Sequence, residues 1–214
     1  MIIHQIYWDF SKKIQCGKMP LLYVSQQKKV IDWCTINGYK YKLWNETMID
    51  NFIIDKYPQF KLIIDSVKYT IMKVDIVKWL ILHDEGGLYL DLDIEPNIIK
   101  IKEYDFAIAS ASPNNYNVDV IQSIKGNTIL LDFVNYIDKQ IKEKDLVVIY
   151  KIWKFRYVLQ TTGPKALNRF IKINKLKPNI YHVNDATTNP PSMNLIGNED
   201  FIDYPSALWA NHIK

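Results

Sequence analysis

Short apolar or alternating segments recur along the chain and predict strands. Residues 2–8 are almost wholly apolar, which is typical of a strand buried on both faces. Residues 39–44 alternate apolar side chains with lysine, the period of a half-buried strand. Three further strands are expected at residues 88–90, 106–109 and 118–124. The sequence distance between these strands is large enough for a helix in most of the connections.

Apolar residues three or four positions apart fill those connections and predict helices. The expected helices cover residues 26–37, 46–57, 62–84 and 128–144, and another begins at Pro164. For the first of them, Ser25 is the expected N-cap and Gly38 the residue that closes the helix. Pro164 suits the first position of a helix because its missing N–H is not needed there.

This alternation of strands and helices predicts an α/β fold in which helices flank a Rossmann-like, mostly parallel sheet. The length of 214 residues fits one full-sized domain, so residues 1–214 are expected to form a single unit. The tail over residues 185–214 is rich in Asn, Asp and Pro, and we expect a loop that lies near the site. In sheets of this kind, ligands bind at the carboxyl ends of the strands.

Composition and charge remove several classes of function. The net charge of +4 is mild and lysine is spread along the chain, so we expect no nucleic-acid partner. Cys16 and Cys34 lie far apart and no CxxC occurs, which argues against a disulfide framework or a cysteine zinc site. No segment of this chain resembles a signal peptide or a membrane span, and we therefore expect a cytoplasmic or otherwise soluble location.

An acidic turn follows the predicted strand at residues 88–90. Asp91 and Asp93 stand two positions apart, with Leu92 between them and the pair Gly86-Gly87 ahead of the strand. Two carboxylates where the pleat of a strand breaks can turn towards one ligand, and Mg²⁺ or Mn²⁺ prefers such hard oxygen ligands. The alternative is an ordinary solvated turn, which is the more common role of an isolated D-x-D.

Asp75 and Lys78 lie three residues apart and therefore on one face of the predicted helix over residues 62–84. One interpretation is a surface ion pair that contributes a few tenths of a kcal/mol. The other is a carboxylate and an ammonium that point over the end of the sheet and grip sugar hydroxyls and phosphate. The spacing alone does not separate the two.

Three blocks of sequence resemble glycosyltransferases with a DXD sugar-binding motif. They are residues 2–8 (IIHQIYW), residues 73–79 (KVDIVKW) and residues 86–93 (GGLYLDLD), with weaker matches at residues 162–164 and at His212. The similarity is to family 32, which contains the yeast-type initiating α-1,6-mannosyltransferases, and more distantly to the clostridial glucosylating toxins. The blocks extend over most of the chain. The match over residues 73–79 and 86–93 taken together is specific, and that over residues 2–8 is moderately so.

This resemblance implies a GT-A fold and a metal-dependent enzyme that uses Mn²⁺ or Mg²⁺. It implies transfer of a hexose from a UDP- or GDP-sugar donor to a glycan or protein acceptor, with retention of the anomeric configuration. Asp93 is then the direct metal ligand, while Asp91 contacts the ribose, the donor sugar or the metal through water. For His212, a metal ligand and a solvated tail residue both remain open, as do transition-state stabilisation and a plain strand-edge position for Asp119.

The resemblance also assigns residues that bind the donor. Tyr7 takes the place of a Trp that stacks on the nucleobase, and Trp44 with Asn45 lies near a second segment that contacts the base. The remaining donor-binding positions are Asp75, Lys78, Gly87 and Asp91. The chain departs from the family pattern because Lys78 replaces an Arg and so loses the bidentate fork, and because no Ser-Trp pair follows His212.

Other functions compete with this interpretation. A glycoside hydrolase would divide acid and base roles between carboxylates such as Asp75, Asp91 and Asp93, but two acids at i, i+2 share a metal more readily. A nucleotidyltransferase is disfavoured because no Gly-rich phosphate loop lies near the N-terminus. A catalytically degenerate protein that only binds sugar nucleotides or glycans is the main alternative. His4 is expected to be a packed strand residue bonded to a neighbouring backbone rather than a general base.

Overall fold

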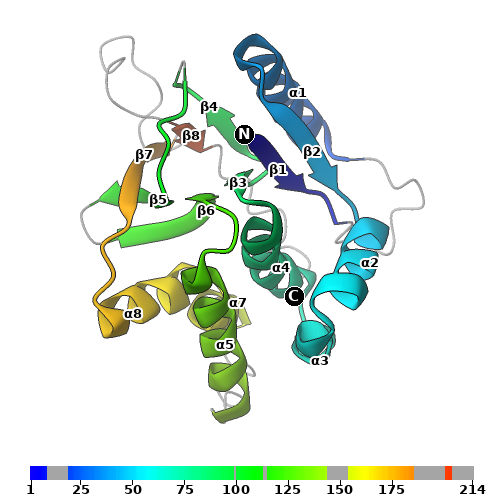
Figure 1. Cartoon of the computed structure of the whole chain (residues 1–214), viewed down its shortest axis with the longest axis vertical. Coiled ribbons are helices and arrows are strands. Elements are labelled where there is room, and N and C mark those ends of the chain that lie inside the picture. The colour runs from blue at the N-terminus through cyan, green and yellow to red at the C-terminus, as the bar shows by residue number, and fades with distance from the viewer. Residues whose placement is uncertain (9–18, 99, 113–114, 144–153, 186–200, 204–214) are drawn as a thin grey trace.

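Eight strands form a mixed sheet in the computed structural model, which describes residues 1–8, 19–98, 100–112, 115–143, 154–185 and 201–203. The strands are β1 (Ile2–Ile6), β2 (Lys40–Trp44), β3 (Gly87–Leu90), β4 (Ile94–Pro96), β5 (Phe106–Ser112), β6 (Asn115–Ser123), β7 (Asn179–Asp185) and β8 (Phe201–Asp203). Their order across the sheet is β2-β1-β3-β6-β5-β7-β8-β4 (Figure 1). All five strands expected from the sequence are present, whereas β4, β7 and β8 were not expected.

The sheet is mostly parallel, as the sequence predicted. β1 pairs in parallel with β2 and β3, and β7 pairs in parallel with β5 and β8. The antiparallel pairs are β3 with β6, β5 with β6, and β4 with β8. Because β6 runs against β3, the first residues of β6 lie at the same edge of the sheet as the last residues of β3.

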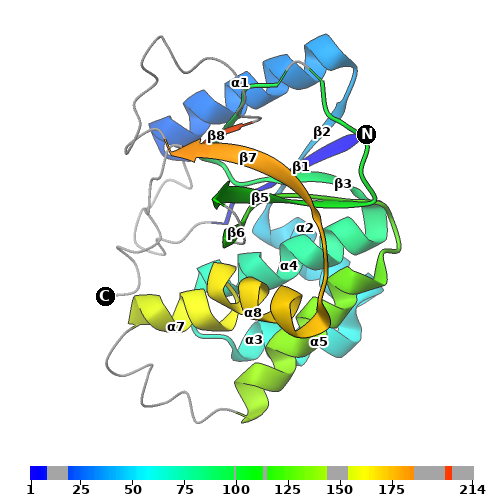
Figure 2. The ribbon, with the colours of Figure 1, turned by 90° about the vertical axis from the view of Figure 1, so that its left-hand side faces the viewer.

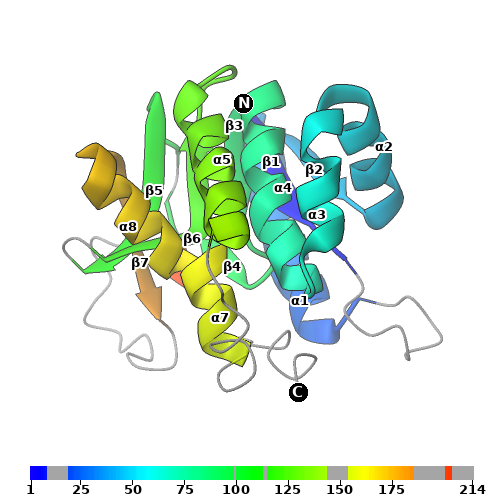
Figure 3. The same ribbon diagram turned by 90° about the horizontal axis from the view of Figure 1, so that it is seen from below.

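Helices cover both faces of the sheet and make three layers. They are α1 (Leu21–Asn37), α2 (Glu46–Lys56), α3 (Lys61–Ser66), α4 (Thr70–Glu85), α5 (Thr128–Glu143), α7 (Lys154–Thr161) and α8 (Pro164–Asn174), with a 3-10 turn η1 at Pro58–Phe60. Helix α1 lies on one face, and the other helices lie on the opposite face (Figures 2 and 3). The connection from β1 to β2 thus crosses one face of the sheet, and the connection from β2 to β3 crosses the other. Strand β1 lies between β2 and β3.

Strand periodicity divides the core between the two faces. Leu88 and Leu90 pack on the side of α1, together with Val30 of that helix, whereas Tyr89 between them packs on the side of α4. This is the alternation expected of a strand that is buried on both faces. Asp91 lies two residues after Tyr89 and continues this alternation, so it lies on the same face of the sheet as Tyr89.

Helix α4 is enclosed by the rest of the protein. Every residue from Val74 to Leu82 is buried, since the helix lies between the sheet and its neighbours α3 and α5. The sequence predicted one helix over residues 62–84, and this is wrong at its start. The chain leaves the helical conformation at Val67, which is extended, and the side chains of Val67 and Tyr69 pack into the core there.

Three other local expectations need correction. Helix α1 begins at Leu21 after Pro20, so Ser25 is an interior residue and not its N-cap, although the helix does end at Gly38. Helix α7 was not expected. In the expected C-terminal loop, residues 201–203 form β8, because they pair with both β4 and β7, while residues 186–200 and 204–214 lie outside the described part.

Candidate functional site

Four residues lie along one edge of the sheet. Asn45 follows β2, Tyr7 follows β1 and Asp91 follows β3. Asp119 is the middle residue of the antiparallel β6 and lies just beyond the last residue that pairs with β3. Main-chain hydrogen bonds continue the pairing into this edge: the N–H of Tyr7 donates to Trp44 O at 2.9 Å, and that of Asp91 donates to Asp119 O at 2.8 Å. The edge lies at the crossover point where α/β folds bind ligands.

The first carboxylate of the acidic turn is held on several sides. The hydroxyl of Tyr89 donates to Asp91 Oδ1 at 2.7 Å, and Gln5 Nε2 donates to the main-chain oxygen of Asp91 at 3.2 Å. Gln5 is in turn fixed, because its Oε1 accepts a hydrogen bond from Tyr41, whose hydroxyl accepts one from Gln27. Asp91 therefore has a fixed position before any ligand is bound.

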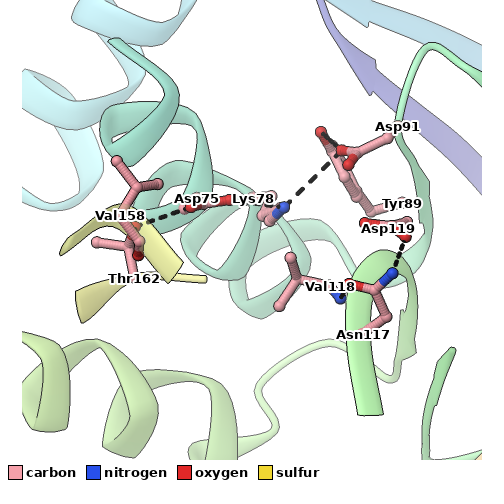
Figure 4. A network of polar contacts seen from close by, with 9 residues as sticks. All are labelled: Asp75, Lys78, Tyr89, Asp91, Asn117, Val118, Asp119, Val158 and Thr162. Carbon is pink, nitrogen blue, oxygen red and sulfur yellow. Dashed lines mark hydrogen bonds and ion pairs between the residues drawn. The ribbon is translucent and has the colours of Figure 1, made fainter. Parts of the chain in front are cut away.

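Lys78 lies beneath the acidic turn. Its Nζ is 3.0 Å from Asp75 Oδ1 and 3.8 Å from Asp91 Oδ1, and it faces the ring of Tyr89 with 5.2 Å to the ring centroid (Figure 4). The Lys78 side chain is only 1% exposed and that of Asp75 5%. The interpretation of this pair as a surface ion pair is therefore wrong, because α4 is enclosed on all sides.

The electrostatics of the cluster follow from burial and close charges. Burial disfavours the ammonium form of Lys78, but the carboxylates of Asp91 and Asp75 outweigh it and raise its pKa above the usual value. Burial raises the pKa of Asp91 to about 6; the charge of Lys78 opposes this rise, and that of Asp93 adds to it. For Tyr89, burial and the neighbouring Asp91 raise the pKa well above its usual value, so its hydroxyl is a hydrogen-bond donor.

Negative charge exceeds positive charge at this edge. Asp75, Asp91 and Asp119 all act electrostatically on Lys78, and Asp93 acts on Asp91. A cavity of about 70 Å³ lies beside the turn and is lined by Asp91, Asp93, Tyr23 and apolar side chains. A divalent cation would offset the surplus, and the carboxylate oxygens are ligands of the type that Mg²⁺ and Mn²⁺ prefer.

The acidic turn could supply only some of the ligands of a metal ion. Within the described residues, no three Asp, Glu, His or Cys side chains gather closely enough to hold an ion by themselves. If Asp91 and Asp93 held an ion, most of its coordination sphere would be left to other ligands, as is usual for Mg²⁺ bound with phosphates and water. His212 lies outside the described residues, so the structure gives no position for it.

Asp119 is brought to the cluster by strand pairing. In an antiparallel pair, residues directly opposite each other point to the same face of the sheet. Leu90 pairs with Val120, so Asp91 and Asp119 are opposite each other and both belong to the α4 face. Asn117 Nδ2 donates to Asp119 Oδ2, which fixes the orientation of this carboxylate.

The residues expected to contact a nucleobase divide into two groups. Tyr7 and Asn45 lie at the edge and are not buried. The Trp44 side chain is instead a core group: it is buried, packs on Phe52 and donates from Nε1 to His4 Nδ1 at 3.1 Å. Asn45 Oδ1 caps α2 by accepting from Met48 N, so of this segment only the main chain and Asn45 Nδ2 are left for a ligand.

Gly87 and His4 belong to the other end of β3. Gly87 begins the strand, four residues before Asp91, and the structure does not bring it to the acidic cluster. His4 is fully buried and bonds with Nε2 to Gly86 O at 2.9 Å, which confirms the expected structural role. Its Nδ1 accepts from Trp44, so the neutral ring satisfies both partners.

Four contributors to the site were not singled out from the sequence. Tyr89 shares a strand face with Asp91, and the period of two would have been enough to find it. Gln5 and Thr162 lie in the matched blocks at residues 2–8 and 162–164, but, like Asn117, they show no periodicity that indicates a contact with the site. Thr162 Oγ1, for example, donates to Asp75 Oδ2 at 2.8 Å across 87 residues of sequence.

Residues 23–103 match the family described as glycosyltransferase sugar-binding region containing DXD motif. This match includes α1, α4, β3 and the acidic turn, that is, most of the site described above. This part of the chain is similar to the DXD glycosyltransferases. The similarity favours sugar transfer over the hydrolytic interpretation of the same carboxylates.

Several curated proteins that resemble this chain have mannosyl transfer in their names. Inositol phosphoceramide mannosyltransferase 3 of Schizosaccharomyces pombe is 33% identical over 135 residues, which is 62% of this chain and 35% of the relative. Mannosyl phosphorylinositol ceramide synthase SUR1 of Saccharomyces cerevisiae is 30% identical over 78% of this chain and 40% of the relative. This chain thus spans well under half of the length of these relatives.

Solved structures confirm the GT-A fold. PaToxG glycosyltransferase aligns over 81% of this chain and 68% of its own with a TM-score of 0.55 and 15% identity. A glycosyltransferase involved in glycosylation of the major capsid of PBCV-1 aligns over 100% of this chain and 98% of its own, with a TM-score of 0.51 and 11% identity. In the described part of the chain, no helix has the length and apolarity needed to cross a membrane.

Proposed function

We propose that this protein transfers a hexose from a nucleotide-sugar donor to an acceptor hydroxyl in a metal-dependent reaction. The observation that carries the proposal is the acidic edge: Asp91 and Asp93 follow β3 directly, Asp119 is bonded to the first of them through the main chain, and Lys78 lies below. Intact carboxylates at all three positions favour an active enzyme over a degenerate binding protein.

Asp93 is the proposed direct ligand of Mn²⁺ or Mg²⁺. Asp91 already accepts a hydrogen bond from Tyr89 and faces Lys78 through the same oxygen, Oδ1, so it has less freedom to turn towards an ion. When bound, the cation would neutralise charge on the leaving diphosphate. Lys78 is paired and almost fully buried, and its proposed role is to balance the charge of Asp91 rather than to grip phosphate.

The donor is proposed to lie along the edge of the sheet. Its base would lie near Tyr7 and Asn45, which follow β1 and β2. Its diphosphate would lie at the acidic turn, and its sugar near Asp119. Asp119 would then stabilise positive charge that develops on the sugar. Retention is proposed from the family resemblance, with the leaving phosphate accepting the proton of the attacking hydroxyl on the same face of the sugar.

Mannose is the first hexose to test, and an inositol phosphate headgroup the first acceptor. Both choices come from the names of the yeast relatives, which are mannosyltransferases of inositol phosphoceramide. The chain itself supports an anionic donor or acceptor through its net charge of +4. GDP-mannose and UDP-glucose therefore form the core of the donor panel.

Ligand-induced stabilisation tests this proposal. A ligand that binds only the folded state at 100 times its Kd adds about 2.7 kcal/mol to the free energy of unfolding, which raises Tm measurably. We expect one nucleotide sugar to raise Tm with Mn²⁺ and to lose the effect when EDTA is added. Equal melting curves across all nucleotide sugars, or a shift that EDTA leaves unchanged, would contradict metal-dependent donor binding.

A further inference from the structure

A chain of polar contacts runs from the acidic turn to the junction between α7 and α8. Thr162 Oγ1 donates to Asp75 Oδ2 at 2.8 Å, Asp75 Oδ1 lies 3.0 Å from Lys78 Nζ, and Lys78 Nζ lies 3.8 Å from Asp91 Oδ1 (Figure 4). Thr162, Asp75 and Lys78 are all buried. The contacts therefore link a residue outside the DXD block to the first carboxylate of that block.

The two oxygens of the Asp75 carboxylate have different partners. One oxygen is engaged by the hydroxyl and the other by the ammonium of Lys78. A buried carboxylate oxygen that loses its donor is costly, so Asp75 would rotate to offer both oxygens to Lys78. That rotation draws the ammonium towards Asp75 and away from Asp91.

The backbone around Thr162 is well placed to hold its hydroxyl still. The N–H groups of Thr162 and Gly163 both donate to Val158 O at 3.1 Å, which ties the junction to the last turn of α7. A Cβ atom at Gly163 would lie 3.0 Å from Leu159 Cα, so the turn is tight as well. These contacts fix the main chain at Thr162, and its Oγ1 lies 3.5 Å from Val158 O as well as 2.8 Å from Asp75 Oδ2.

We propose that Thr162 is a positioning residue for the glycosyltransferase reaction: its hydroxyl orients Asp75 so that Lys78 stays between Asp75 and Asp91 and fixes Asp91 for the metal and donor. This inference rests on the proposed function. A purely structural role would be different, because a bond that only anchors the α7–α8 junction to α4 affects Tm without affecting turnover.

Three variants separate these roles. Thr162→Val removes the hydroxyl and keeps the shape, and Thr162→Ser restores the donor. Thr161→Val is the matched control, because Thr161 is also buried and its Oγ1 has no hydrogen-bond partner among the described residues. For each protein, Tm, kcat and KM for the donor, and the Mn²⁺ concentration that gives half-maximal activity are measured.

We expect Thr162→Val to lower kcat by about tenfold and to need more Mn²⁺, because Asp91 loses its contact with Lys78 and is less well fixed beside the metal ligand Asp93. Thr162→Ser should recover most of the turnover, and Thr161→Val should match the wild-type protein. Wild-type kcat and Mn²⁺ dependence in Thr162→Val would overturn the inference, even if Tm falls. Equal losses in Thr162→Val and Thr162→Ser, or in Thr161→Val, would also overturn it. If Thr162→Val does not fold, Thr162→Cys takes its place, since a thiol is a weak donor, and should fall below Thr162→Ser.

Failure of the proposed function gives a different result. A wild-type protein that transfers no sugar from any donor would contradict that function while leaving the geometry of Asp91 measurable by Mn²⁺ titration. In that case Thr162→Val should bind Mn²⁺ several-fold more weakly than both the wild-type protein and Thr162→Ser. Equal Mn²⁺ binding by all three would overturn the role of Thr162 as well.

Discussion

The two ends of β3 are built on different principles. At its start, Gly86 and Gly87 have φ values of 69° and 103°, where L side chains are strained, and other main-chain segments press against them. At its other end, Asp91 is surrounded by Tyr89, Lys78 and the main chain of Asp119. Close packing of the main chain determines which residues fit at the first end. Charge and hydrogen bonding determine the arrangement of side chains at the second.

This difference separates stability from function within one strand of four residues. A Cβ atom at Gly87 would overlap the main-chain oxygen of Ile2 in β1, and one at Gly86 would lie 2.7 Å from Lys125 N. Changes at the glycine end therefore disturb the sheet itself. Changes at the acidic end remove ligands from an open edge, so we expect them to alter activity while leaving the fold in place.

The largest effect is expected at the acidic end. Asp93→Ala should lower kcat/KM by about 10²–10³-fold, or about 3 to 4 kcal/mol of transition-state stabilisation, because it removes a charged group from the reacting phosphates. Steady-state transfer assays measure this, with melting curves to confirm folding. Glu95→Gln is the matched control, because Glu95 pairs with Lys29 on α1 and should retain activity. Full turnover by Asp93→Ala would contradict the assignment of the site.

The next effect is expected at the glycine end. Gly87→Ala should lower the free energy of unfolding by roughly 3 kcal/mol, since backbone strain and steric overlap act together. Gly38→Ala shares a positive φ of 68° but has no atom within 4 Å of the new Cβ, so it should lose only about 1 kcal/mol. Urea unfolding of both variants isolates the cost of the overlap. Equal losses would show that strain alone explains the glycine.

A smaller, pH-dependent effect is expected at His4, which bonds to Gly86. Burial lowers the pKa of His4 from 6.5 to about 4, although Glu85 and Gly86 favour the charged form. Between those pH values the unfolded chain binds the proton and the folded chain does not, so stability is lost as pH falls below 6.5. From pH 7 to pH 5 we expect a loss of about 2 kcal/mol from this group.

His4→Gln provides the comparison for that measurement, because it removes the titrating group and leaves all other ionisable groups unchanged. The difference in unfolding free energy between the two proteins, followed by urea titration at several pH values, should shrink by about 2 kcal/mol between pH 7 and pH 5. A constant difference would mean that His4 keeps an ordinary pKa in the folded protein.

Periodicity predicted most of the framework, and the position of Asp91 and Asp93 after a strand predicted the acidic edge. Local patterns did not predict which side chains are buried where contacts between residues distant in sequence determine burial. The family resemblance placed Trp44, the last residue of β2, near the nucleobase, but its side chain packs on Phe52 and bonds to His4 in the core. For Asp75 and Lys78 the spacing left a surface ion pair and a role in the site both open, and only the packing of α4 between other elements shows that the pair is buried.

The main-chain bond between Asp91 and Asp119 has a practical consequence. Because N–H and C=O groups set the spacing of these two positions, side chains can be exchanged at 119 without displacing residue 91. Position 119 is therefore suited to saturation mutagenesis, which measures what its carboxylate contributes to turnover. Val120 and Ile121 are fully buried and keep the strand in register, so the library changes the chemistry beside the donor within a constant frame.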